Sequence, residues 1–84
     1  MEADIEVLEA HHTKKQDAPS GTALLLGDAA ARGRGQVLAD VAAYDRNGKD
    51  EVHKTGSIGF ASIRAGDIVG EHTCLLYTSP SPRD

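Results

Sequence analysis

The sequence predicts an α+β fold, with a mixed β-sheet and one main helix. Two observations carry this prediction: apolar and polar residues alternate with a period of two near both ends of the chain, and one apolar stretch between them, residues 23–32, has a helical composition. The chain has 84 residues, so it is at most one domain, and it buries only roughly 60–65% of the surface that its unfolded form exposes. Only three aromatic residues are present, Tyr44, Phe60 and Tyr77. We therefore expect a thin core and a piece of a larger protein.

The first predicted strand covers residues 4–10, where Ile5 and Val7 share one face. Ser20 or Thr22 can cap the predicted helix at 23–32, because their hydroxyls accept hydrogen bonds from free N–H groups of the first turn. Gly33 and Gly35 are expected to end the helix. Its buried stripe is expected to consist of Leu24, Leu25, Leu26 and Ala29.

The second half of the chain is expected to return to strands. Residues 36–44 are compatible with a strand or a short helix, and we favour a short connection that runs into a strand near 41–44. A polar surface loop at 45–55 contains the turn pair Asn47-Gly48. Beyond it, residues 57–64 are expected to form a hairpin with residues 68–75 through a turn at 65–67. Pro80 and Pro82 interrupt the apolar pattern, so residues 77–84 are expected to be a disordered tail.

Composition excludes several classes of protein. The net charge is −4 and the pI is about 5.4, with no basic stripe, which argues against a nucleic-acid surface. Cys74 is the single cysteine, so the chain has no internal disulfide and offers zinc no thiolate pair. No apolar run approaches the ~20 residues that cross a bilayer, and no signal peptide is recognisable at Met1. We therefore expect a cytoplasmic protein without a membrane partner.

Residues 11–22 combine the groups that hold an anion and move a proton. Histidine side chains have an unperturbed pKa near ~6.5, so a histidine at position 11 can donate or accept a proton close to neutral pH. Lys15 can donate a proton, and the free N–H groups of Ser20-Gly21-Thr22 at a helix start can hold a carboxylate. His12 can join this site only if the chain bends, since successive strand residues face opposite ways. The alternatives are an ordinary helix cap, solvated lysines and, less favoured, a metal site; we assign no metal.

The same region resembles the signature of the dihydrodipicolinate reductases, also called 4-hydroxy-tetrahydrodipicolinate reductases. The matching positions are Glu6, Val7, Glu9, His11, Lys15, Asp17, Pro19, Ser20, Gly21, Thr22 and Ala23. A second block, residues 56–73, is similar to a late hairpin of that family. Together the two blocks cover most of residues 4–73.

This resemblance implies a two-domain, NADPH- or NADH-dependent oxidoreductase of the diaminopimelate route to lysine, assembled as a homotetramer. Its N-terminal Rossmann domain would bind the cofactor and is absent from this chain, which contains no Gly-x-Gly-x-x-Gly after a strand. Residues 1–76 would be part of the C-terminal substrate-binding and oligomerisation domain. We expect the chain to be truncated at both ends, with a foreign segment after residue 73.

The resemblance also implies roles for individual residues. His11 and Lys15 would take part in proton transfer to a cyclic dicarboxylate, and the residues that bind this substrate would be His12, Ser20, Gly21 and Thr22. The remaining polar side chains are expected to be structural: His53, His72 and Cys74, with Arg64 paired to Asp67 in preference to a cofactor contact. The rival hypothesis is a non-catalytic anion-binding or oligomerisation module that lacks the cofactor domain.

Overall fold

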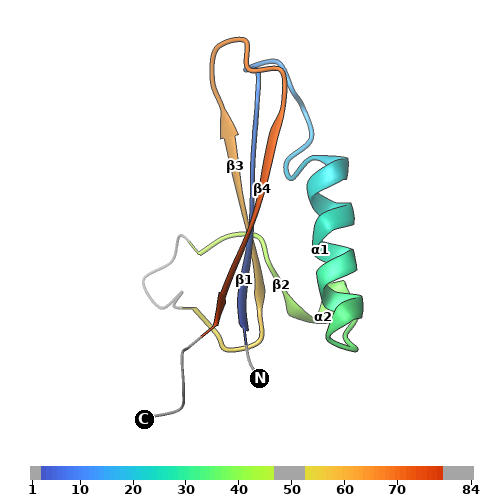
Figure 1. Cartoon of the computed structure of the whole chain (residues 1–84). Helices are drawn as coiled ribbons and strands as arrows, with labels where there is room; N and C mark the ends of the chain where they lie inside the picture. Colours follow the sequence, from blue (N-terminus) through green and yellow to red (C-terminus); the bar gives the residue numbers. More distant parts are fainter. Residues whose placement is uncertain (1–2, 47–52, 79–84) are drawn as a thin grey trace.

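The computed structural model describes residues 3–46 and 53–78 and shows a small α+β domain (Figure 1). Its strands and helices, in chain order, are β1 (Ala3–His11), α1 (Gly21–Gly33), α2 (Leu38–Val41), β2 (Ala42–Ala43), β3 (Ile58–Arg64) and β4 (Glu71–Thr78). The predicted α+β class, with a mixed sheet and one main helix, is confirmed. The expected turn at Asn47-Gly48 lies outside the described residues.

The four strands form one mixed sheet in the order β2-β3-β1-β4. β1 is parallel to β3 and antiparallel to β4, and β2 is parallel to β3. The expected hairpin between the last two strands is therefore wrong, because β1 lies between them. The connection passes around the end of β1: the Ala65 N–H donates to the His11 carbonyl at 3.0 Å, and the Thr13 N–H donates to the Gly66 carbonyl at 3.2 Å. These bonds return the chain on the far side of β1.

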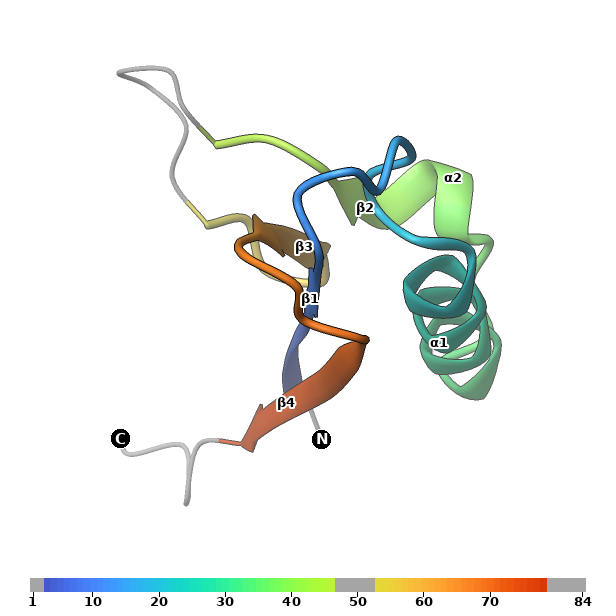
Figure 2. The ribbon, with the colours of Figure 1, turned by 90° about the horizontal axis from the view of Figure 1, so that it is seen from above.

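Helix α1 lies along one face of the sheet, as Figure 2 shows from above. Its buried residues are Ala23, Gly27 and Ala31, spaced four apart. The expected leucine stripe is therefore wrong: Leu24 and Leu25 are 36% and 71% exposed, Ala29 is exposed and Leu26 is only partly buried. Small residues face the sheet because they let the helix backbone approach it closely.

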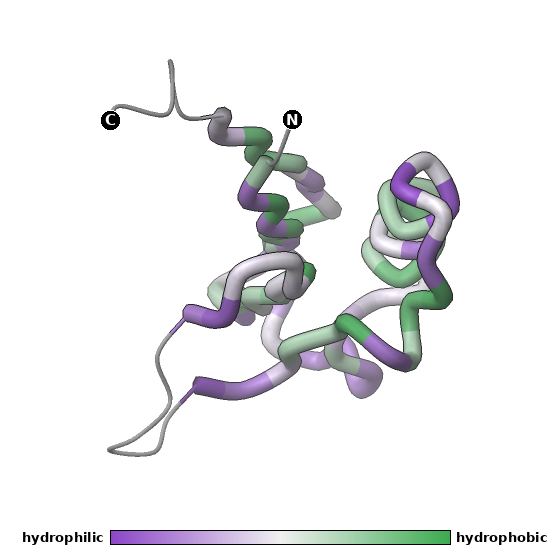
Figure 3. Tube along the Cα trace, turned by 90° about the horizontal axis from the view of Figure 1, so that it is seen from below, coloured by the Kyte–Doolittle hydropathy of each residue, from purple (hydrophilic) through white to green (hydrophobic). Residues whose placement is uncertain are grey.

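The core between α1 and the sheet is small. It consists of two residues each from β1 and β3, together with two alanines of the helix: Ile5, Val7, Ile58, Phe60, Ala23 and Ala31. At the start of β1, the apolar residues at 3, 5 and 7 alternate with the acidic residues at 4 and 6, and the strands in Figure 3 carry both hydrophobic and hydrophilic colours. Every residue of β4 is exposed, so the buried core lies between α1 and the strands β1 and β3.

The helix ends where the glycines predict. Gly35 has φ of 72°, a left-handed conformation that glycine adopts without steric cost. The Gly35 N–H donates to the Arg32 carbonyl at 2.9 Å and the Gln36 N–H to the Ala31 carbonyl at 2.8 Å. These two bonds close the C-terminal turn.

The segment at 36–44 contains both of the alternatives that its sequence leaves open. Residues Leu38–Val41 form the short helix α2, and the strand is limited to Ala42–Ala43. At the other end of the chain, β4 continues two residues into the expected tail, since Tyr77 and Thr78 pair with Asp4 and Ala3. Within residues 3–46 and 53–78, no helix is long and apolar enough to cross a membrane.

Candidate active site

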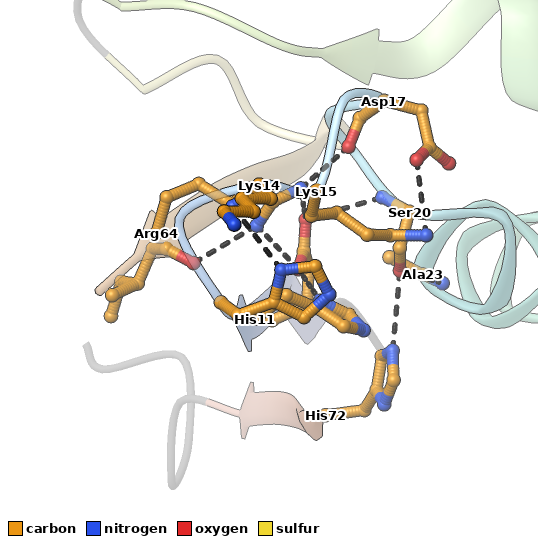
Figure 4. A network of polar contacts seen from close by, with 11 residues as sticks. His11, Lys14, Lys15, Asp17, Ser20, Ala23, Arg64 and His72 are labelled. Carbon is orange, nitrogen blue, oxygen red and sulfur yellow. Dashed lines mark hydrogen bonds and ion pairs between the residues drawn. The ribbon is translucent and has the colours of Figure 1, made fainter. Parts of the chain in front are cut away.

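The strand registers place four polar side chains on one face of the sheet. Residues that pair across neighbouring strands point to the same face, and here His11 pairs with Arg64 while Glu9 pairs with His72. Glu9 and His11 share this face because they lie two residues apart on β1. The start of α1 brings Ser20 against the same group (Figure 4).

Glu9 is at the centre of this network and is only 1% exposed. Its carboxylate lies 2.6 Å from Nδ1 of His11 and accepts from the Ser20 N–H at 3.1 Å. Two guanidinium nitrogens of Arg64 donate to it at 2.9 and 3.0 Å. Burial opposes ionisation, but the hydrogen bonds from Arg64, His11, Ser62 and the Ser20 backbone outweigh it and lower the pKa of Glu9 from 4.5 to about 2. The group therefore carries a negative charge at neutral pH.

Two histidines meet above this carboxylate. The His11 and His72 rings are 5.2 Å apart and nearly perpendicular, in an edge-to-face contact. Nε2 of His72 lies 3.2 Å from Oγ of Ser20. The same Oγ accepts from the Ala23 N–H at 3.2 Å, so Ser20 is the N-cap that the sequence predicts.

The loop between β1 and α1 carries the lysine into the same region. Nζ of Lys15 pairs with Asp17 at 3.0 Å, and this hydrogen bond holds the pKa of the Asp17 carboxyl below its usual range. The Asp17 carbonyl accepts from Arg64 at 2.6 Å. Arg64 thus ties the loop to Glu9, and the network runs from Lys15 to His11 without a break in the chain of contacts (Figure 4).

The chain bends where a substrate-binding His12 requires it. β1 ends at His11, and the next turn is closed by a bond from the Lys15 N–H to the His12 carbonyl at 3.2 Å. Nδ1 of His12 accepts from the Lys14 N–H at 3.2 Å. This local bond orients the His12 ring, for which the described part of the chain shows no hydrogen bond to the buried network.

The first turn of α1 offers free hydrogen-bond donors. Ser20 satisfies the N–H groups of Ala23 and Leu24, whereas those of Gly21 and Thr22 have no partner among the described residues. Both residues are exposed, and apart from the adjoining residues and helix backbone no atom lies within 4 Å of where a Cβ on Gly21 would stand. Two free N–H groups at the positive end of a helix can hold a carboxylate from solution.

Three residues of this site were not recognised from the sequence. The expected pair of Arg64 with Asp67 is wrong, because the parallel register turns Arg64 toward Glu9. His72 was expected to be structural, yet it contacts His11 and Ser20. Glu9 is the third such residue, and the period of the strand could have indicated it. Position 9 continues the apolar face of Ile5 and Val7, and a carboxylate buried on that face requires partners for its charge.

The described residues do not fit a nicotinamide dinucleotide. A dinucleotide site needs a glycine-rich turn between a strand and a helix, whereas β1 is followed by a loop at 12–20 that contains the Lys15–Asp17 pair and no glycine. Among residues 3–46 and 53–78, no three His, Cys, Asp or Glu side chains gather in a way that would hold a metal ion. We assign neither group to this part of the chain.

The site combines a histidine over a buried, ionised carboxylate, which can exchange a proton, with a lysine and a free helix start, which can hold an anion. Residues 1–81 match the family model described as dihydrodipicolinate reductase, C-terminus, and the chain belongs to this family.

Similar full-length proteins carry the same name. The chain is 59% identical over 75 residues to the 4-hydroxy-tetrahydrodipicolinate reductase of Parvibaculum lavamentivorans, covering 89% of this chain and 28% of that protein. It is 64% identical over 73 residues to that of Dinoroseobacter shibae, covering 87% of this chain and 27% of that protein. The chain therefore spans little more than a quarter of the relatives that it matches.

Proposed function

We propose that the full-length protein is an NAD(P)H-dependent 4-hydroxy-tetrahydrodipicolinate reductase that forms tetrahydrodipicolinate in the diaminopimelate route to lysine. Residues 1–76 belong to its substrate-binding and oligomerisation domain. The observation that carries the proposal is the contact network that links His11, Lys15 and the start of α1 through Glu9, Arg64 and Asp17. The printed names of the relatives support the choice of reaction.

The proposed reduction needs a hydride and a proton, and they come from different groups. Conversion of the 4-hydroxy compound to tetrahydrodipicolinate replaces a hydroxyl group by hydrogen, so one hydride and one proton enter and water leaves. The hydride comes from the nicotinamide cofactor, for which the described residues provide no site. This chain supplies the proton through His11 or Lys15, both within the network that surrounds Glu9.

Hydrogen-bond donors and positive charge on this chain bind the negatively charged carboxylates of the substrate. The N–H groups of Gly21 and Thr22, the Ser20 hydroxyl and the His12 ring hold the carboxylates of the substrate, and Lys15 adds a positive charge to the same region. These interactions fix the ring so that its reacting carbon lies near the proton donors. We further propose a cytoplasmic homotetramer without nucleic-acid or membrane partners.

A chimera tests the proposal. In it, the matched residues of this chain replace their counterparts in the Parvibaculum lavamentivorans protein, which supplies the remaining length. The chimera should oxidise NADPH or NADH only in the presence of substrate. His11→Gln and Lys15→Ala should each lower kcat about a hundredfold or more with a small change in KM, because both residues act in the transition state.

The controls separate three outcomes. An elevated KM with unchanged kcat would show that both residues only bind substrate. An inactive chimera beside an active parent protein would contradict the reductase and favour the non-catalytic anion-binding module. His53→Gln, which changes a histidine outside the site, should leave both constants unchanged.

A further inference from the structure

The buried carboxylate of Glu9 is held by several hydrogen-bond donors. They are Nδ1 of His11, the Ser20 N–H, the guanidinium of Arg64 and the Ser62 side chain. Replacing a buried ion pair by apolar residues is often neutral or stabilising, so stability alone does not explain this arrangement. Its geometry instead determines the state of the His11 ring.

An ionised carboxylate accepts hydrogen bonds and cannot donate one. Since Glu9 lies 2.6 Å from Nδ1 of His11, Nδ1 must carry a proton in order to donate to it. A neutral His11 then has its lone pair on Nε2, and a charged His11 has its second proton there. The Arg64 guanidinium and the Ser20 N–H can only donate, so they stabilise the ionised form of Glu9, and the carboxylate does not take the proton from the ring.

The Nε2 side of the ring lies against Gly70. A Cβ at position 70 would stand 3.2 Å from Nε2 and 3.4 Å from Cδ2 of His11. Gly70 is not among the glycines with positive φ, so its backbone does not require glycine. The missing side chain leaves space next to the one ring atom that Glu9 leaves free.

We propose that Glu9 is a positioning residue: its carboxylate holds the proton of His11 on Nδ1, so that Nε2 exchanges a proton with substrate, and Arg64 holds that carboxylate in place. This inference rests on the proposed reductase function. Glu9 itself touches neither substrate nor cofactor. Its contribution is to select one tautomer and to stabilise the imidazolium whenever Nε2 is protonated.

The first measurement needs no variant. In the chimera labelled with ¹⁵N-histidine, solid-state NMR of the sedimented protein at about pH 9, where histidine is neutral, should show His11 with a protonated Nδ1 and a bare Nε2. The His11 signals are assigned by their loss in His11→Gln. A proton on Nε2 in the unmodified protein would overturn the proposal, whether or not the chimera is active.

The second measurement uses two matched variants. Glu6 lies on β1, as Glu9 does, and forms a similar bidentate pair with Arg46, at 2.6 and 3.2 Å. It forms no hydrogen bond with His11 among the described residues. Glu9→Gln should mix the two tautomers of His11 and lower kcat about a hundredfold with little change in KM. Glu6→Gln should change neither the tautomer nor kcat.

The outcomes distinguish this inference from the proposed function. Unchanged kcat in Glu9→Gln, or an equal loss in both variants, would contradict a positioning role. An inactive chimera would count against the reductase, while the NMR signals of His11 would still decide the tautomer.

Discussion

Gly27 offers a test of how closely α1 approaches the sheet. Gly27 lies in the middle of α1 and is buried. In an exposed helix interior, Gly→Ala is expected to stabilise by about 1 kcal/mol. Here a Cβ would overlap the Phe60 ring and stand 3.5 Å from a methyl group of Leu38.

The neighbouring structure prevents the Phe60 ring from moving aside easily. The ring is 9% exposed and stacks on Tyr44 with centroids 5.1 Å apart. Inserting a methyl group into such a site costs about 1–3 kcal/mol. Set against the helix-propensity gain of about 1 kcal/mol, Gly27→Ala should therefore lower the free energy of unfolding by up to about 2 kcal/mol.

Gly33→Ala is the matched control. Gly33 ends the same helix, and apart from the adjoining residues and helix backbone no atom lies within 4 Å of where a Cβ on Gly33 would stand. It should be neutral or stabilise by up to about 1 kcal/mol. Urea unfolding of the chain, followed by circular dichroism with trimethylamine oxide added for weakly stable variants, measures both. Phe60→Leu should partly rescue Gly27→Ala in a double-mutant cycle. If Gly27→Ala stabilises as much as Gly33→Ala, the close approach of α1 is refuted.

Three further predictions concern the site. The pKa of Glu9 is lowered from 4.5 to about 2, so the contribution of its ionised form to stability is present above about pH 4.5 and is lost as the pH falls toward 2. Urea midpoints should fall across this pH range in the unmodified chain. Glu9→Gln should not show this pH-dependent fall. Arg64→Met should lower the urea midpoint more than Arg46→Met, because Glu9 is buried and the carboxylate partner of Arg46 is half-exposed; equal losses would contradict this. Gly21→Ala in the chimera should weaken the binding of a pyridine-dicarboxylate inhibitor about tenfold, measured by calorimetry, and should leave the melting temperature unchanged or raised. Unchanged affinity would mean that the start of α1 is only an ordinary helix cap.

The residues proposed for the site, 11–22, were located by a family signature, whereas the local sequence was sufficient for the main elements. Alternation with a period of two located β1 and β3, and Ser20 and Gly35 marked the two ends of α1. Each of these inferences depends on neighbours within a few residues. Such short-range preferences act before any tertiary contact forms, so they can be read from the chain itself.

Strand pairing and helix orientation were decided only by the tertiary structure. The pattern at 68–75 specifies a strand but not its partner, and only the sheet shows that β4 pairs with β1. Small residues of α1 face the sheet, contrary to the leucine pattern, because close backbone approach to Phe60 excludes larger ones. The network of Glu9, Arg64 and His72 depends on the registers of strands more than 50 residues apart. No local preference encodes such a register, because it follows from which faces of distant segments are buried together.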